Sequence, residues 1–179
     1  MVDLSAIAKW PNVPACYEWL SLDRRGNWRL QGERVTHRGL IEFMNRQYGV
    51  DDRGAWFVQN GPQRVFVDLA ATPWVFHQHG DEFLAHTGQP VGAIDYLLID
   101  ESGNFYMKTS LGIGLLDDRD LPALAADCTS PNGTLAVEED FLAAIEGASQ
   151  VIFWRGLEIR PIIAASLAAE FGFLPQPRP

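Results

Sequence analysis

One short pattern, Asp-x-x-Gly-x-aromatic, occurs three times in this chain and constrains its fold more than any other feature. The copies begin at Asp23, Asp51 and Asp100. An aspartate favours the start of a type I turn because its carboxylate accepts hydrogen bonds from the backbone N–H groups that follow. The glycine tolerates a left-handed backbone, and the aromatic residue suits a strand packed on a core. The pattern therefore predicts three β-hairpin tips; it predicts shape but no chemistry.

The composition narrows the class of protein. The chain has 179 residues, of which 47% are apolar and six are tryptophan, so one domain with a substantial core is expected. The 14 basic residues are outnumbered by 23 acidic ones, which gives a net charge of −9. Nucleic acids and anionic membrane surfaces both attract clustered Lys and Arg, so this balance argues against either partner.

We expect the protein to be cytoplasmic. Residues 1–10 lack the basic start and long apolar run of a secretory signal, and no stretch approaches the ~20 apolar residues of a membrane span. Cys16 and Cys128 lie far apart in the sequence. Without an export signal we expect two unlinked, reduced thiols, with a disulfide as the alternative.

The order of the expected elements predicts an α+β fold. Helices and strands mix without a β-α-β rhythm, which favours antiparallel, hairpin-rich sheets with repeated motifs packed against a few helices. Residues 1–179 are expected to form one compact domain, in which two lobes would span 16–90 and 91–175. The expected strands are residues 18–22, 27–31, 55–59, 64–69, 74–77, 94–99, 104–108 and 150–154.

Four helices are expected, over residues 2–10, 37–48, 138–146 and 161–172. Thr36 is the expected N-cap of the second helix and Gly49 its C-terminal stop. Pro161 suits the first position of the last helix, which is almost uncharged. A flexible acidic loop is expected from Gly112 to Asp120.

The first and third tips share more than their turns. Residues 17–23 read Tyr-Glu-Trp-Leu-Ser-Leu-Asp and residues 95–100 read Asp-Tyr-Leu-Leu-Ile-Asp, and both turns continue with Gly-Asn-aromatic. This likeness predicts an internal structural repeat.

His77, His79 and His86 are the candidate metal ligands. Residues two apart on a strand point the same way, so His77 and His79 could reach one ion. A cupin-type enzyme uses such a His-x-His pair with a carboxylate and a further histidine. The spacing to Glu82 is tighter than that pattern, however, and no second half of a cupin signature follows. The alternative is a polar loop between strands.

Lys108, Thr109, Arg155 and Glu158 are the candidate ligand-binding residues. They stand at the ends of expected strands in otherwise apolar segments, where such groups form a small anion or ligand pocket. The alternative is an Arg–Glu ion pair that fixes a loop. Neither a Gly-x-Ser-x-Gly elbow nor a cysteine beside a basic residue is found, so the sequence indicates no catalytic nucleophile.

Several segments, in this order, resemble an uncharacterised bacterial family, the domain of unknown function numbered 1285. They are the turn at 23–28, the helix at 40–48, the alternating valines and Pro-Trp of 65–74, and the strings at 108–112 and 155–158. The resemblance implies an α+β fold with repeated hairpin-rich motifs and a role in signalling, and it implies no catalytic residues.

The chain departs from that family at two places. Gln63-Arg64 stands where an acidic-basic pair is usual, and residues 127–146 have no counterpart. A distant member or a sister family is therefore expected.

The leading functional hypothesis is a non-enzymatic cytoplasmic domain, without a cofactor, that binds a small ligand or a protein partner in regulation. Its turn and core residues are well specified, whereas catalytic patterns are weak. The first alternative is a metal-dependent enzyme that uses the three histidines. The second is an assembly subunit that forms a homo-oligomer through the apolar segment Ile162–Phe171.

Overall fold

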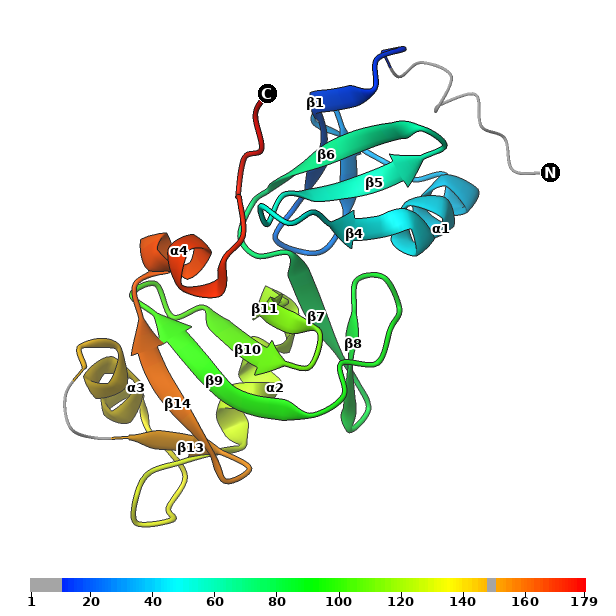
Figure 1. The fold of residues 1–179 in the computed structure, drawn as a ribbon. Helices are drawn as coiled ribbons and strands as arrows, with labels where there is room; N and C mark the ends of the chain where they lie inside the picture. Colours follow the sequence, from blue (N-terminus) through cyan, green and yellow to red (C-terminus); the bar gives the residue numbers. More distant parts are fainter. Residues whose placement is uncertain (1–10, 148–150) are drawn as a thin grey trace.

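The structure, a computed structural model, describes residues 11–147 and 151–179 (Figure 1). These residues form two mixed β-sheets and four short α-helices, which confirms the predicted α+β class. The first sheet has the order β3-β2-β1-β6-β5-β4, and the second has the order β12-β13-β14-β9-β10-β11-β7-β8. The helix expected at 2–10 lies outside the described residues.

The strands of the first sheet are β1 (Ala15–Leu22), β2 (Trp28–Leu30), β3 (Glu33–Arg34), β4 (Tyr48–Val50), β5 (Trp56–Asn60) and β6 (Gln63–Leu69). Those of the second are β7 (Trp74–His79), β8 (Glu82–Ala85), β9 (Ile94–Asp100), β10 (Phe105–Thr109), β11 (Gly112–Leu116), β12 (Cys128–Thr129), β13 (Ile152–Trp154) and β14 (Leu157–Ile162). The helices are α1 (Arg38–Gln47), α2 (Leu121–Ala126), α3 (Glu138–Ile145) and α4 (Leu167–Phe171).

The two sheets connect their strands in the same way. Without β7 and β8, the second sheet has the order β11-β10-β9-β14-β13-β12, which matches the first sheet strand for strand. In each sheet a helix, α1 or α2, follows the third strand of the set, and the first and last strands pair in parallel at the centre. An internal repeat would produce this correspondence, but strand order alone does not establish one, so the repeat stays a prediction.

The sheets are mixed where the sequence predicted antiparallel ones. β1 pairs with β6, β7 with β11 and β9 with β14 in parallel. Hairpins fix the direction only of strands that are neighbours in the chain, and apolar alternation does not show which distant strand closes a sheet. The same long-range pairing carries β7 and β8, expected in the lobe at 16–90, into the second sheet.

The three predicted hairpin tips are confirmed. Gly26, Gly54 and Gly103 have φ angles of +74°, +82° and +77°. In each tip the aspartate carboxylate accepts backbone N–H groups two and four residues ahead, at 2.9–3.0 Å. Burial raises the pKa of these carboxyls, but the hydrogen bonds outweigh it and hold each pKa below its ordinary value.

A fourth turn of the same kind follows β12, where the sequence has Ser130 in place of an aspartate. The Ser130 N–H donates to the Thr134 carbonyl and the Gly133 N–H to the Ser130 carbonyl, both at 2.9 Å. Gly133 has a φ of +82°. The turn-rich character of this stretch was predicted, but its equivalence to the other tips was not. No carboxylate holds this turn: Asn132 Oδ1 accepts the Thr134 N–H at 3.0 Å, and the Ser130 hydroxyl donates to the same oxygen.

Both ends of α1 differ from the prediction. The N-cap is His37, whose Nδ1 accepts the Leu40 N–H at 3.2 Å, and not Thr36. At the other end Tyr48 is already extended and begins β4, so Gly49 is a strand residue and not a helix stop. The Tyr48 ring packs on the Trp28 ring of the first sheet, with centroids 5.2 Å apart, a contact that Tyr48 makes from its extended position.

The last helix is much shorter than predicted, because Pro161 lies inside β14 and α4 begins only at Leu167. A short apolar run does not distinguish a buried strand from a buried helix. The segment Ile162–Phe171, expected as an oligomer-forming helix, is therefore part strand, part turn and part helix. Leu167 in it is buried, whereas Ile163 is 62% exposed.

The prediction of a flexible acidic loop from Gly112 to Asp120 is also wrong. Its first half is β11, which pairs with β10 and β7. Gly114 is required there because a Cβ atom would collide with the Phe76 ring. Asp117, expected in solvent, has a fully buried side chain. Tertiary contacts thus bury β11 and Asp117, although this segment is rich in glycine and acidic residues.

Side chains from both sheets share one core. One buried cluster contains Leu20 and Val65 of the first sheet together with Leu98 and Tyr106 of the second and Leu167 of α4. A second cluster lies between the second sheet and α2 and α3. Cys16 belongs to the first cluster and Cys128 to the second, and both are free, which confirms the unlinked thiols. Burial raises the pKa of both thiols.

The C-terminal segment ties the two sheets together (Figure 1). After α4 it returns to the first sheet, where the Leu174 N–H donates to the Gly54 carbonyl at 2.9 Å and the Leu69 N–H donates to the Pro175 carbonyl at 2.8 Å. Arg178 then pairs with Asp68 at 2.8 Å. The Asp51 tip is therefore a docking point as well as a turn.

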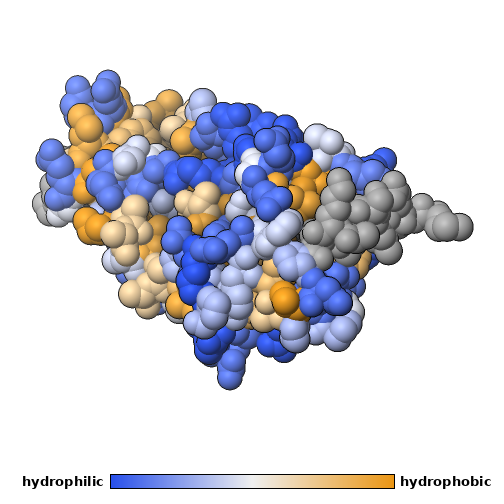
Figure 2. All heavy atoms as spheres, turned by 90° about the horizontal axis from the view of Figure 1, so that it is seen from above, coloured by the Kyte–Doolittle hydropathy of each residue, from blue (hydrophilic) through white to orange (hydrophobic). Residues whose placement is uncertain are grey.

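The surface of the molecule seen from above is mainly hydrophilic, with small hydrophobic patches between (Figure 2). Among the described residues no helix is long and apolar enough to cross a bilayer.

Gly26 and Gly103 provide a matched test of tip docking. A Cβ at Gly26 would lie 2.6 Å from His86 Cβ, whereas a Cβ at Gly103 meets nothing within 4 Å. Both changes to alanine incur the left-handed penalty of about 1–2 kcal/mol, and Gly26→Ala adds overpacking of about 1–3 kcal/mol. We expect urea denaturation to show a clearly larger loss of unfolding free energy for Gly26→Ala. Equal losses in the two variants would contradict close docking of the first tip.

Candidate functional site

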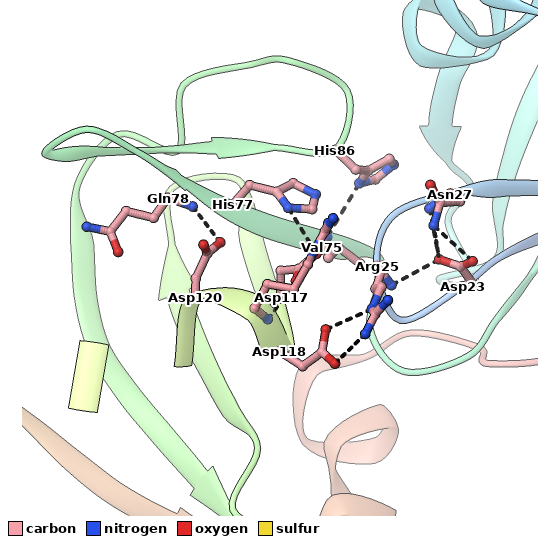
Figure 3. A network of polar contacts seen from close by, with 11 residues as sticks. Asp23, Arg25, Asn27, Val75, His77, Gln78, His86, Asp117, Asp118 and Asp120 are labelled. Carbon is pink, nitrogen blue, oxygen red and sulfur yellow. Dashed lines mark hydrogen bonds and ion pairs between the residues drawn. The ribbon is translucent and has the colours of Figure 1, made fainter. Parts of the chain in front are cut away.

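The candidate site lies at the seam between the two sheets, where the first hairpin tip reaches β7 (Figure 3). An ideal Cβ at Gly26 would lie 3.3 Å from His77 Nε2 and 3.4 Å from Val75 Cβ, besides its closer approach to His86. A glycine is needed here both for its positive φ and for this contact. The tip therefore brings the arginines that precede Gly26 to the second sheet.

Arg25 forms the ionic link across the seam. Its Nε and Nη2 donate to the two oxygens of Asp118 at 2.9 and 2.8 Å, as a bidentate pair (Figure 3). Both side chains are about half exposed. Solvent weakens such a pair, so it orients the tip more than it stabilises the fold.

Asp117 is the buried charge of the site. Its carboxylate accepts Arg119 Nε at 2.8 Å and Arg119 Nη2 at 2.6 Å, and it lies 3.2 Å from His77 Nδ1. Burial raises the pKa of Asp117, but the hydrogen bonds and charge of Arg119, with the charge of His77, outweigh it and hold the pKa at about 2. Asp117 is therefore ionised at neutral pH and anchors the corner after β11.

His77, Asp117 and Asp120 form the one group of possible metal ligands found among the described residues. Their ligand atoms lie within 4.8 Å of one another. An imidazole with two carboxylates suits zinc or manganese, so the residue types fit a divalent ion. Arg119 opposes a cation, because its guanidinium already occupies Asp117, and Asp120 accepts the Gln78 N–H at 2.9 Å. A metal would have to displace the arginine.

The three histidines of the sequence prediction occupy different surroundings. His77 faces Asp117, and His79 lies exposed at the end of β7. The Nδ1 of His86 accepts the Val75 N–H at 3.4 Å. Its Nε2 is buried without a hydrogen-bond partner among the described residues. The metal-ligand group thus contains only His77 of the three, with two aspartates in place of the other histidines.

An aromatic cluster surrounds His86 and closes the inner side of the seam. The imidazole centroid lies 5.4 Å from Tyr48, 5.5 Å from Trp28 and 5.7 Å from Trp74. Burial, and then the nearby charge of His77, lower the pKa of His86 to about 3. The Tyr48 hydroxyl donates to the Pro73 carbonyl at 2.8 Å. Rings from both sheets therefore hold a neutral imidazole between them.

A cavity of about 280 Å³ opens beside this network. It is lined by Arg24, Arg25, Asn104, Leu115, Leu116 and Asp118. The arginines come from the first tip and Asn104 from the third, so two tips of the same motif meet at one cavity. No carboxylate lies within the 4.0 Å ion-pair distance of Arg24 among the described residues. Its guanidinium therefore has charge to offer a ligand.

The four residues predicted from the sequence to bind a ligand do not come together. Each engages a neighbour of its own. Lys108 lies 3.7 Å from Asp95, Thr109 donates to the Gly112 carbonyl at 3.1 Å, Arg155 pairs with Asp127 at 3.1 Å and Glu158 pairs with Arg160 at 3.1 Å. Thr109 is fully buried, whereas Arg155 projects from the exposed β13–β14 turn. Their role as a ligand-binding site stays a prediction.

Sequence reasoning missed the seam residues although one signal was present. The two variable positions of the first tip are both arginine, whereas those of the third tip are Glu101 and Ser102. A basic pair at an exposed turn of an acidic chain marks a place where charge is concentrated. Asp117 and Asp118, which face the first tip across the seam, fall in the segment for which the sequence predicts a flexible acidic loop.

Comparison with known proteins gives a family. The model of the family DUF2944, described as "Protein of unknown function (DUF2946)", matches residues 1–178. The chain belongs to this family. Comparison with the curated proteins finds no match.

Two solved structures are similar to the chain. A DUF1285 family protein from Silicibacter pomeroyi DSS-3 aligns with a TM-score of 0.54 at 13% identity, over 90% of this chain and 88% of that one. A DUF1285 family protein from Shewanella baltica OS155 aligns with a TM-score of 0.44 at 12% identity, over 57% of this chain and 86% of that one. The first likeness shows a shared fold, and the predicted resemblance to that family is confirmed.

The neutral His86 makes the stability depend on pH. Its pKa rises from about 3 in the fold to the ordinary 6.5 on unfolding, so between these values the unfolded chain binds the extra proton and stability falls as the pH falls. We expect a loss of about 2 kcal/mol between pH 7.5 and pH 5 in urea denaturation. His86→Gln should reduce this loss, and His79→Gln at the exposed strand end should keep it. The same loss in both variants would show that His86 is not its source.

Proposed function

We propose that this protein is a non-enzymatic binding domain for a small anionic ligand, which occupies the seam cavity between the first and third hairpin tips. The observation that carries the proposal is the meeting of Arg24 and Arg25 with Asn104 around a cavity of about 280 Å³. A volume of this size suits a small metabolite. Arginine presents several N–H donors in a fixed plane, which match a carboxylate or a phosphate.

The two arginines would act differently. Arg24 lies beside the Tyr106 hydroxyl, which is neutral, and no carboxylate lies within ion-pair distance of it among the described residues, so its charge would be available to an anion. Arg25 is held by Asp118, and the exposure of that pair lets an anion compete for the guanidinium. The net charge of −9 repels anions from the surface as a whole, so this cavity would be a local exception.

A regulatory role follows from the place of the cavity in the fold. Its walls come from both sheets, so an anion bound there would stabilise the docked arrangement of the first tip over an undocked one. The free energy of anion binding would thereby be coupled to the docking of the first tip at the seam. We further infer that the two tips are equivalent parts of a repeated unit, and that the protein acts in the cytoplasm, where its two buried thiols would stay reduced.

A panel of small anions tests the binding proposal. We expect isothermal titration with mono- and dicarboxylates and phosphate esters to find a saturable one-to-one ligand, whereas neutral analogues should not bind. Arg24→Ala should weaken the affinity about tenfold or more, because a charge-assisted hydrogen bond is lost. Arg160→Ala, which removes an exposed arginine from β14, should leave it unchanged. Equal affinity in both variants, or no anion bound at millimolar concentration, would reject the proposal.

A metal-dependent function is the second candidate, and the group of His77, Asp117 and Asp120 is the observation that favours it. His77 Nδ1 and Asp117 Oδ2 lie 3.2 Å apart, which suits two ligands of one tetrahedral ion. Elemental analysis of the purified protein is the measurement. On this candidate we expect stoichiometric zinc or manganese that is lost in His77→Ala and kept in His79→Ala. Protein free of metal after dialysis against either ion would exclude it.

A further inference from the structure

A second cavity, of about 230 Å³, lies in the second sheet and differs in chemistry from the seam. It is lined by Asp81, Glu82, Phe83, Pro90, Ile94 and Trp154, with the backbone of Gly92. Asp81 comes from the tip between β7 and β8, Glu82 and Phe83 from the start of β8, and Trp154 from the end of β13. Acidic and aromatic side chains thus share one enclosure.

Trp154, which lines the cavity, carries a polar group that lacks a partner in the described part of the chain. Its side chain is nearly inaccessible, with 4% of the residue exposed. Its Nε1–H has no hydrogen-bond partner among the described residues. A buried donor without an acceptor costs free energy, so such a group in a cavity calls for an acceptor that arrives with a ligand or a water.

The aromatic walls suit a cation. The rings of Phe83 and Trp154 stand edge to face, with centroids 5.8 Å apart and an interplanar angle of 73°. Two rings at a steep angle form a corner whose negative faces attract an ammonium group. One face of the Trp154 ring is occupied by the Arg155 guanidinium, 4.7 Å from its centroid, and Asp127 pairs with that guanidinium at 3.1 Å. The ammonium group would therefore use the aromatic surface that Arg155 leaves open.

The carboxylates supply the charge. Asp81 and Glu82 are exposed, and neither has a Lys, Arg or His nitrogen within 4.0 Å among the described residues. They therefore lower the electrostatic potential at the mouth of the cavity, while the nearby charge of Arg155 is balanced by Asp127. Acidic side chains alone would be an ordinary solvated turn; together with the aromatic corner and the unpaired indole they define a recognition site.

We propose that this cavity binds a small organic ammonium ion that carries an oxygen acceptor. The ammonium group would lie against the Phe83–Trp154 corner and face Asp81 and Glu82, and the oxygen would accept the Trp154 N–H. The site is independent of the anion-binding function proposed for the seam, since it shares no residue with that cavity.

Choline and its neutral carbon isostere, 3,3-dimethylbutan-1-ol, are the matched probes. They have nearly the same shape and the same hydroxyl oxygen, and only choline is charged. We expect calorimetric titration of the full chain to show saturable one-to-one binding of choline at least tenfold tighter than that of the isostere. Ethanolamine tests whether a primary ammonium is preferred to a quaternary one, and binding of either supports the proposal.

Three variants locate the binding. Glu82→Gln and Asp81→Asn change exposed side chains, so they should fold normally, and each should weaken choline binding about fivefold to tenfold. Asp52→Asn removes an exposed carboxylate from the tip between β4 and β5 and should leave the affinity unchanged. No binding of either ammonium probe at 10 mM, equal affinity for the isostere, or equal effects of the three substitutions would overturn the proposal.

Discussion

The contact of Gly26 with the imidazoles of β7 and the loop after β8 is the constraint on which the seam depends. A hairpin tip without a side chain at this point approaches within van der Waals distance of His77 and His86. The approach brings Arg25 to Asp118 and closes Trp28 and Tyr48 over His86. The relative placement of the two sheets is therefore set by one turn whose geometry is local, together with the return of the C-terminal segment to Gly54.

Buried polar groups at the seam are handled in two ways. Asp117 keeps its charge, because Arg119 and His77 surround its carboxylate with donors. His86 loses its charge, because rings surround it and its neighbour is another histidine. The partners of the charged Asp117 fix its position. His86 has no charged partner and stays neutral, and for this reason the stability of the fold falls in acid. The ionised Asp117 and the neutral His86 both give the seam polar contacts of defined geometry.

The two cavities have opposite chemistry because they take their charged residues from different turns. The seam cavity takes its arginines from the variable positions of the first tip. The other cavity takes its carboxylates from the β7–β8 hairpin, which extends the second sheet beyond the strands that correspond in both sheets. Fold and site are thus separable: glycine and aspartate fix the turns, and the neighbouring residues are free to carry function.

The sequence by itself determined the local geometry of this protein. Asp23, Asp51 and Asp100 specify turns through hydrogen bonds that span four residues, so the three tips followed from the local sequence. The α+β class followed from the order of the expected helices and strands. The seam did not follow, because Arg25 meets Asp118, and Gly26 meets His86, across long stretches of chain. The parallel pairs, the burial of Asp117 and the strand at Pro161 were also decided by tertiary structure. The physical reason is that local hydrogen bonds are encoded in adjacent residues, whereas burial and long-range pairing are properties of the packed whole.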